Sequence, residues 1–537
     1  MIIGAVVLAS VPAGIVASGQ LTQVAASSVA SRSSSAAATS EGLARLLSLS
    51  ADLGPARIGS IDVMVTLGSA RRPEQLQAWA GRHHLAVTWY SGDQFAVVFG
   101  SAASVGAAFG VAIDSYRSRS GELFYSAIRQ PGVPAQLSPG VTGIGSINNY
   151  GRLTTQLVTH DFVPNGGLTP QGLLEAYEAT PLSDNLQGEG ETVVFLEGSP
   201  VEQSDLNDFT QKFGLPQIQL QTVGGDASGG ASESGEADMD IETVHEIAPQ
   251  AKLVYFNVFS APGVTNSTDD GAAMALSISA IAHEFPGAVI SASLGLCERS
   301  QNSADMQALS SAAATEEATG GTVFASSGDT GGADCGNYGA DSLTSAEGVQ
   351  LPAAAPNITG VGGTTLSVTT NGDYAGETTW SMPMMSQGSG GGVSTIASRP
   401  SWQTGPGVGG SGIPDMREVP DVGADADPVT GTAFITDGQL QSGGGTSLAT
   451  PIWAGFTALI DQFLHNSGVS PVGFANPVFY KLAADTQLSP PPFHDVTVGG
   501  NVFYQAGPGY DAVTGLGSPD VAALAQYILN LDKSGSG

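Results

Sequence analysis

The sequence predicts an α/β protein in which a small α+β domain precedes a larger domain built on a doubly wound, mostly parallel sheet. Between residues 168 and 328, apolar runs such as "ETVVFLEG" and "GTVFASSG" alternate with segments of helical periodicity. Strand–helix alternation of this kind is typical of parallel sheets that helices cover on both faces. Between residues 58 and 131 the runs are shorter and strands outnumber helices, which favours an antiparallel sheet.

The larger domain is predicted to span residues 168–532. It opens with a helix at 168–179, in which Thr169 stands before Pro170 as a cap. Because sites form at the carboxyl ends of parallel strands, residues directly after a strand are candidates for function. The expected strands are 191–198, 217–223, 252–259, 288–295 and 321–328, and the expected helices are 201–213, 236–248, 271–284, 302–318 and 453–464.

The small domain is predicted to span residues 58–131, and a linker rich in Gly, Pro and Asn follows it at 132–167. The expected strands are 61–67, 85–90, 93–100, 111–118 and 122–127, with helices at 73–84 and 101–110.

The ends of the chain have a different composition. Residues 1–18, "MIIGAVVLASVPAGIVAS", are apolar but short for a membrane span. We interpret them as a secretory signal segment, with a membrane anchor as the alternative, and therefore expect a secreted, extracellular protein. The Ala- and Ser-rich residues 19–57 and the tail 533–537 are expected to be disordered.

The charge balance excludes some classes of partner. The chain carries 17 Lys and Arg against 49 Asp and Glu, a formal net charge of −32. Nucleic acid and anionic membranes would repel such a surface. The composition suits an acidic medium, because a chain with few bases builds little positive self-repulsion when its carboxylates protonate. A generic acidic secreted protein would share this composition.

The two cysteines, Cys297 and Cys335, exclude a disulfide scaffold and a cysteine-based zinc site. Each follows the expected end of a strand, in "SLGLC" and "SSGDTGGADC", and neighbouring parallel strands would bring these ends together. One disulfide in an oxidising compartment is our interpretation, and two free buried thiols are the alternative.

The segment "SGGGTSLATPIWAG" presents Ser447 after a glycine run and before an apolar helix. A serine in this setting is either a nucleophile at the positive end of a helix dipole or an ordinary helix cap. A nucleophile needs a base, and none of the seven histidines stands in a glycine-flanked catalytic setting. The sequence has no His-Gly-Thr, and its first large-domain strand ends "FLEGSP", which argues against a histidine-based serine protease of the subtilisin kind.

Carboxylates offer an alternative base. In "GEADMDIETVHEIAPQ", Glu236 and Asp240 stand four residues apart and project from one helix face. They either stabilise the helix dipole or form a coupled pair that accepts a proton at low pH, where histidine would be charged. Asp329, in "SSGDTGG", is either a turn residue or, when protonated, a donor to an oxyanion.

Taken together, these stretches resemble the kumamolisin-like members of the sedolisin family of serine-carboxyl peptidases. The matching segments include "EADMDIETVHEIAPQAKL", "FASSGDTGG", "REVPDVGADADPVTG" and "GGTSLATP", in family order over roughly residues 168–525. The resemblance implies a subtilisin-like fold and a small N-terminal domain that is the propeptide. It implies Ser447 as nucleophile, Glu236 as general base, Asp240 as the residue that orients Glu236, and Asp329 as oxyanion stabiliser.

The resemblance also implies two binding sites. The strand edge Ser293, Leu294 and Gly295 is expected to pair with the substrate backbone, although some relatives have Trp where this chain has Leu294. One structural Ca²⁺ is expected on an oxygen-only set. The sequence alone indicates only a turn rich in Gly and Asp at these positions. Its members are Asp495, Val496, Gly507, Gly509 and Asp511.

The predicted function is therefore that of a secreted, acid-acting serine-carboxyl endopeptidase. We expect a monomer made as a zymogen that cuts itself in the 132–167 linker, with protein or peptide substrates and with its own propeptide as intramolecular inhibitor. The alternatives are a tripeptidyl exopeptidase of the same family and a non-catalytic binding protein on the same fold.

Overall fold

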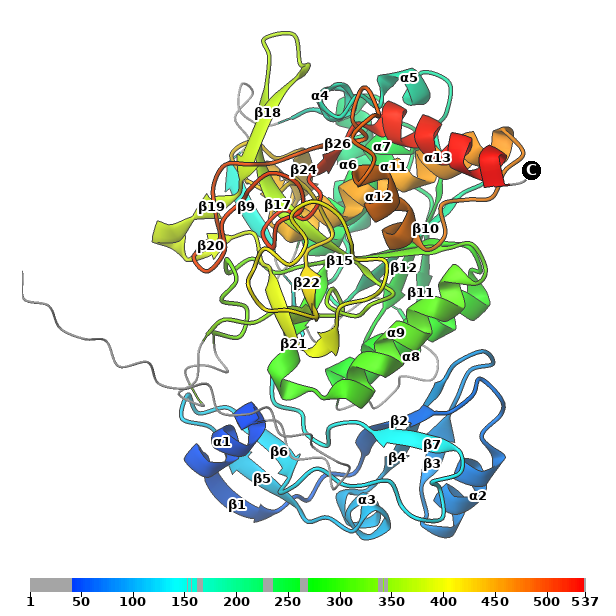
Figure 1. The fold of residues 1–537 in the computed structure, drawn as a ribbon, viewed down its shortest axis with the longest axis vertical. Coiled ribbons are helices and arrows are strands. Elements are labelled where there is room, and N and C mark those ends of the chain that lie inside the picture. Colours follow the sequence, from blue (N-terminus) through cyan, green and yellow to red (C-terminus); the bar gives the residue numbers. More distant parts are fainter. Residues whose placement is uncertain are drawn as a thin grey trace, which may run out of the picture. The chain divides into compact units, whose positions relative to one another are not determined.

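The computed structural model describes residues 41–535, except for 152, 156, 162–167, 226–234, 261–268, 337–340 and 342–345 (Figure 1). The predicted signal segment at residues 1–18 lies outside these residues. Within the described part of the chain, no helix has both the length and the apolar character needed to cross a membrane.

The larger domain is built on an eight-stranded sheet that is parallel except for one edge strand. The strand order is β11-β12-β10-β13-β15-β17-β18, with β23 also paired to β17, and only β18 runs antiparallel to its neighbour. This is the predicted doubly wound sheet. Its strands are β10 (Thr192–Glu197), β11 (Leu220–Val223), β12 (Lys252–Asn257), β13 (Val289–Ala292), β15 (Thr322–Ser326), β17 (Thr359–Val368), β18 (Tyr374–Thr379) and β23 (Val422–Asp425).

Helices cover both faces of this sheet. Along β10, Val193 and Phe195 join the core that contains α7 (Glu236–Ile247) and α11 (Thr446–Asn466). The intervening Val194 and Leu196 join the core beneath α8 (Asp270–Glu284) and α9 (Ser303–Glu317), which lie side by side (Figure 1). A strand buried on both faces explains the continuous apolar run "TVVFL".

The small domain has the predicted antiparallel character. A four-stranded sheet has the order β3-β4-β2-β7 and a three-stranded sheet has the order β1-β5-β6. On β2, Val63 and Val65 face the small domain's own core, whereas Met64 joins the core beneath α8 and α9. The elements are β1 (Ala51–Pro55), β2 (Ile61–Leu67), β3 (Ala86–Thr88), β4 (Phe95–Gly100), β5 (Ile113–Arg117), β6 (Leu123–Ala127), β7 (Val141–Ile144), α1 (Glu41–Leu49), α2 (Glu74–Arg82) and α3 (Ala102–Phe109).

The remaining elements complete the larger domain and its connections. They are β8 (Thr154–Thr155), β9 (Val158–Asp161), α4 (Pro170–Ala176), α5 (Thr180–Ser183), α6 (Gln203–Phe213), β14 (Leu294–Cys297), η1 (Glu298–Ser300), β16 (Gln350–Leu351), β19 (Ser381–Met382), η2 (Pro383–Met385), β20 (Gln387–Gly388), β21 (Gly392–Ser398), β22 (Met416–Val419), β24 (Ala433–Thr436), β25 (Gln439–Gly444), α12 (Ala475–Ala483), β26 (Phe493–His494), β27 (Ser518–Pro519) and α13 (Val521–Gly535).

Four segments differ from the sequence prediction. The stretch predicted as a linker at 132–167 contributes β7 to the four-stranded sheet of the small domain, which therefore extends past residue 131. Part of the stretch expected to be disordered at 19–57 forms α1 and β1, because Leu43 and Leu46 pack against Tyr116 and Phe124. The tail expected from residue 533 is helical through Gly535. The helix expected at 453–464 begins seven residues earlier, at Thr446, and Pro451 lies inside its early turns.

Cys297 and Cys335 form a disulfide, with their Cα atoms 5.1 Å apart. Cys297 ends β14, which follows β13 directly, and Cys335 lies in the loop after β15. Because β13 and β15 are adjacent parallel strands, their carboxyl ends bring the two loops together. The disulfide thus joins two loops at the edge where the candidate site lies.

Candidate active site

Ser447 is the second residue of α11 and is fully buried. It follows β25 through Gly445, whose φ of 88° is a conformation that favours glycine. The Ser447 hydroxyl has no hydrogen-bond partner among the described residues. A buried hydroxyl at the positive end of a helix, with its hydrogen-bonding capacity unused, suits a nucleophile that awaits a substrate.

Pro451 explains how the backbone of Ser447 is held. In a regular helix the amide of residue 451 would donate to the carbonyl of residue 447, but proline has no N–H. The Ser447 carbonyl instead lies 3.2 Å from the hydroxyl of Ser293. The same hydroxyl donates to Asp240 Oδ2 at 2.5 Å. Ser293 therefore links the nucleophile's backbone to the carboxylate pair.

Glu236 and Asp240 lie one turn apart at the start of α7, and both are fully buried. The helices α7 and α11 lie against each other, and Met239, in the first turn of α7, lies beside Gly443, three residues before α11 begins. Burial, followed by the negative charges of Glu197 and Glu236, raises the pKa of Asp240 well above its ordinary value. Like charges in a buried cluster cannot all ionise, so these carboxyl groups share protons.

Glu197 is a site residue that the sequence analysis missed. It ends β10, which lies between β12 and β13, and its carboxyl group shares a hydrogen bond with Asp240. Burial raises its pKa to about 7. The Ser199 hydroxyl donates to it at 3.2 Å and accepts the amide of Ala237, in the first turn of α7. The available signal was an acidic residue that ends a run of buried apolar residues and precedes glycine.

Asp329 lies in the loop after β15, next to the start of α11. The amide and hydroxyl of Thr446 donate to its Oδ1 at 2.7 and 2.8 Å. Its Oδ2 is buried without a hydrogen-bond partner among the described residues. Burial raises the pKa of Asp329 to about 8. Because Oδ1 accepts two hydrogen bonds, the proton of the neutral acid lies on Oδ2, where it is available to donate.

The four predicted catalytic residues are therefore brought to one edge of the sheet by three elements. The loop after β15 supplies Asp329, α7 supplies Glu236 and Asp240, and α11 supplies Ser447. This set combines a buried serine hydroxyl, a cluster of buried carboxyl groups and a carboxylic acid whose pKa is raised by burial. Such a combination can attack a carbonyl carbon and stabilise the resulting oxyanion.

The predicted substrate edge lies beside this set. Ser293 separates β13 from β14, and β14 begins at Leu294. On one side β14 pairs antiparallel with β16, and on the other side Leu294 and Gly295 pair with β8 of the linker. The edge predicted to bind substrate backbone is thus occupied by the chain's own linker.

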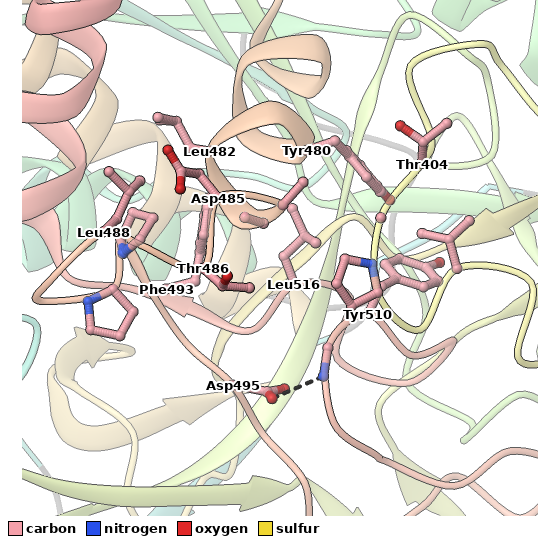
Figure 2. Close-up of a pocket in the computed structure, with 18 residues that line it drawn as sticks. Thr404, Tyr480, Leu482, Asp485, Thr486, Leu488, Phe493, Asp495, Tyr510 and Leu516 are labelled. Atoms are coloured by element: carbon pink, nitrogen blue, oxygen red, sulfur yellow. Dashed lines mark hydrogen bonds between the residues drawn. The ribbon is translucent and has the colours of Figure 1, made fainter.

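The predicted calcium residues lie in two neighbouring loops. Asp495 follows β26, and its Oδ2 accepts the amide of Gly509 at 2.9 Å (Figure 2). Asp511 accepts the amides of Gly507 and Val513. Burial raises the pKa of Asp495, and raises that of Asp511 to about 6. No group of three or more His, Cys, Asp or Glu side chains in the described residues is arranged to hold a metal ion.

Asp495 also borders a pocket of about 290 Å³ (Figure 2). Apolar side chains dominate its lining, among them Leu482, Leu488, Phe493 and Leu516. None of the four predicted catalytic residues lines it. The pocket is therefore distinct from the surroundings of Ser447.

The sheet and the serine–carboxylate site together define a subtilisin-like serine hydrolase. A subtilase-family sequence profile matches residues 222–475. Kumamolisin of Bacillus sp. (strain MN-32) is 31% identical over 458 residues, which cover 81% of this chain and 78% of that protein. The chain belongs to the sedolisin family of serine-carboxyl peptidases.

Two further comparisons agree. Sedolisin of Pseudomonas sp. (strain 101) is 36% identical over 353 residues, which are 63% of this chain and 57% of that protein. The solved structure of Pseudomonas sedolisin, complexed with two molecules of pseudo-iodotyrostatin, superposes with a TM-score of 0.57 at 31% identity. That match covers 68% of this chain and 98% of the solved chain.

We predict that Asp329→Asn lowers kcat/KM about 100- to 1,000-fold at the optimum, the cost of weakening one oxyanion donor. The alkaline limb of the pH profile should also flatten, because asparagine still donates but cannot lose a proton. The measurement is kcat/KM against pH on one peptide. Glu317→Gln is the matched control, since Glu317 also has its pKa raised by burial to about 8 but lies on α9. An unchanged alkaline limb in Asp329→Asn would refute the donor role.

We predict that Glu197→Gln lowers kcat/KM about 10- to 100-fold, a typical cost of removing a supporting partner. The acid limb should move, because Glu197 shares a hydrogen bond with Asp240 and glutamine cannot share a proton with it. The control is Glu316→Gln, whose carboxyl pKa is also raised to about 7 by burial, but on α9. If the rate falls but the acid limb of the pH profile does not move, the role of Glu197 is only structural.

Proposed function

We propose that this protein is a secreted, acid-acting endopeptidase that is made as a self-processing zymogen. The observation that carries the proposal is the position of Ser447 between two carboxyl systems. Asp329 is held through Thr446, and Asp240 through Ser293. In the described part of the chain, no histidine takes part in the hydrogen bonds of these groups.

In the proposed reaction, Glu236 takes the proton of the Ser447 hydroxyl as the oxygen attacks the substrate carbonyl carbon. Asp240 orients Glu236, and the neutral Asp329 donates from Oδ2 to the developing oxyanion. Collapse of the intermediate breaks the C–N bond, and the leaving amine takes the proton from Glu236. A water molecule, deprotonated by Glu236, then hydrolyses the acyl-enzyme and restores Ser447.

Activity in acid follows from the opposite protonation states that Glu236 and Asp329 need. Glu236 must be ionised, whereas Asp329 must be neutral, and its pKa of about 8 keeps it neutral throughout the acid range. A histidine base would be charged at low pH and could not accept the proton. The chain has 49 acidic and 17 basic residues, and this excess of acidic residues also suits an acidic medium.

Secretion and a monomeric state belong to the same proposal. The apolar residues 1–18 and the Cys297–Cys335 disulfide support export to an oxidising compartment. The small domain packs against α8 and α9 of the larger domain, which supports its role as an intramolecular inhibitor. Protein or peptide chains are the proposed substrates.

One structural Ca²⁺ is part of the proposal. The residues that would hold it are Asp495 and Asp511, with the carbonyls of Val496, Gly507 and Gly509, all of which offer the oxygen ligands that Ca²⁺ prefers. The raised pKa values of Asp495 and Asp511 show that burial disfavours their charges, and a cation would offset that cost. The ion would tie the loop at Gly507–Asp511 to the end of β26.

We predict that removal of Ca²⁺ with EGTA lowers the Tm by about 5 °C, as expected for loss of a well-bound ligand. Asp495→Ala should abolish this response. Asp485→Ala is the control, because Asp485 lines the neighbouring pocket but belongs to neither loop. A Tm that does not respond to EGTA would contradict the site.

We predict that Ser447→Ala abolishes cleavage of casein at pH 3–4 and leaves the fold intact, since the change removes one oxygen at the start of a helix. The stability cost should not exceed about 1–2 kcal/mol. The precursor of this variant should also fail to mature in acid unless wild-type enzyme is added. Casein cleavage by the folded variant above background, or maturation of the variant alone, would disprove the assignment.

A further inference from the structure

Two exposed apolar tips lie beside the active-site loop that follows β15. One is the end of the β19–β20 hairpin, where Met384 is fully exposed and Met385 is 61% exposed. The other is a tight turn after β26, where Val502 is 73% exposed and Phe503 is 41% exposed. Large apolar side chains that gather on a surface indicate contact with another molecule. Neither tip belongs to the predicted catalytic set or to the predicted calcium residues.

The hairpin is joined to the backbone of Asp329. The amide of Gly388, in β20, donates to the Asp329 carbonyl at 2.9 Å, and the Gly388 carbonyl accepts the amide of Gly331 at 3.0 Å. On the other side of the hairpin, the amide of the fully buried Trp380 donates to the carbonyl of Gly363, in β17, at 3.1 Å. These backbone hydrogen bonds hold the base of the hairpin in place, while its tip projects from the larger domain (Figure 1).

The second tip lies against the same active-site turn. The amide of Asn501 donates to the Tyr504 carbonyl, and the Asn501 side chain accepts the Tyr504 amide, both at 3.0 Å. A side chain added at Gly331 would meet the Asn501 carbonyl at 3.5 Å, so the two turns are in contact. Between Asn501 and Tyr504, Val502 has a φ of 78°, which is unusual for a β-branched residue. Backbone strain of this kind is often retained where function uses it.

The two tips lie across Asp329 from the predicted substrate edge. In the order of the central sheet, β13 leads to Leu294 and the edge of β14, β15 leads to Asp329, and β17 holds the hairpin through Trp380. The linker shows the direction in which a chain passes Ser447, since its earlier strand β8 pairs with β14 and its later strand β9 pairs with β25. For a substrate in the same direction, the residues on the carboxyl side of the cleaved bond lie away from β14.

The surroundings of the tips are uncharged in a chain that is strongly acidic. Residues 380–398 and 496–510 contain no Asp, Glu, Lys or Arg, whereas the whole chain has 49 acidic and 17 basic residues. An uncharged apolar surface favours an apolar partner over an ion. Methionine is flexible and polarisable, so a tip with two methionines adapts to apolar side chains of different shapes. Four exposed side chains are also far fewer than the roughly 20–30 residues per side of a stable protein–protein interface, which favours an extended segment of polypeptide over a second copy.

We propose that the two tips form a specificity site of this peptidase, which binds apolar side chains of a polypeptide substrate on the carboxyl side of the cleaved bond. This rests on the proposed function. Met384, Met385, Val502 and Phe503 contact substrate and take no part in proton transfer. The site therefore acts on substrate affinity, so its loss raises KM and leaves kcat unchanged.

The site is tested on the mature enzyme with two peptides built on one casein bond that the enzyme cuts. They share all residues before the bond, and the second and third residues after it are Leu and Phe in one peptide and Ser in the other. The apolar peptide should have a KM about tenfold lower, as expected when one apolar side chain is largely buried. Mass spectrometry of the products checks that both peptides are cut at the shared bond.

Substitutions at the hairpin tip connect this preference to the proposed site. The double variant Met384→Ser/Met385→Ser should bring the two KM values together without a change in kcat, whereas Met384→Leu/Met385→Leu should keep the preference. Phe503→Ser should weaken the preference, because it removes the ring from the second tip. Ile413→Ser is the matched control, because it removes a 44% exposed apolar side chain from the loop between β21 and β22.

Oxidation of methionine gives a second readout that requires no substitution. Hydrogen peroxide converts an exposed methionine thioether into a polar sulfoxide. Treated wild-type enzyme should show a KM for the apolar peptide that rises about tenfold, toward the KM of the Ser peptide. The Met384→Leu/Met385→Leu variant should keep its KM after the same treatment, because leucine is not oxidised.

The outcomes separate this inference from the function on which it rests. Equal KM values for the two peptides with the wild-type enzyme would overturn the site, and so would a preference that survives Met384→Ser/Met385→Ser. A fall in kcat in that variant, with KM unchanged, would show that the hairpin only supports the Asp329 loop. Loss of a dimer in that variant, with both KM values unchanged, would assign the tips to a second copy instead. Failure of the wild-type enzyme to cut casein or either peptide would defeat the proposed peptidase function.

Discussion

The structure depends on carboxyl groups that are buried together and must share protons. Glu197, Asp240 and Glu236 meet at the carboxyl edge of the central sheet, where burial and mutual repulsion disfavour full ionisation. The Ser293 hydroxyl joins this cluster to the backbone carbonyl of Ser447. That carbonyl is available because Pro451 has no N–H to donate to it. Asp240 and the backbone of Ser447 are therefore joined by one hydrogen-bonded system.

The same constraint sets how stability depends on pH. Burial raises the pKa of several carboxyl groups above the values they have in an unfolded chain, to about 8 for Asp329 and about 7 for Asp238 and Asp334. Between pH 4 and pH 8 the folded state binds these protons and the unfolded state does not. This contribution to stability is fully present in acid and is lost as the pH rises through the raised values. The fold and the proposed chemistry thus favour the same conditions.

The linker meets the nucleophile through pairings that a substrate would also use. It adds β8 to the edge of β14 and β9 to the edge of β25, so backbone hydrogen bonds hold it with little regard to side chains. The small domain anchors its amino end, since Ser146 donates its amide to Asp305 at the start of α9. A tethered segment of this kind has a high effective concentration, so its pairing with these strand edges is favoured over that of a free peptide.

The sequence by itself determined the features that depend on local pattern. Strand–helix alternation gave the doubly wound sheet, the four-residue spacing placed Glu236 and Asp240 on one helix face, and glycines marked Ser447 and Asp329. The resemblance to a family assigned their roles. Only the tertiary structure decided that Glu197 joins the cluster, that Ser293 bridges Asp240 to Ser447, and that β8 pairs with β14 and β9 with β25. These contacts join residues dozens to hundreds of positions apart, and strand register and the packing of α7 against α11 create them, so no local pattern encodes them.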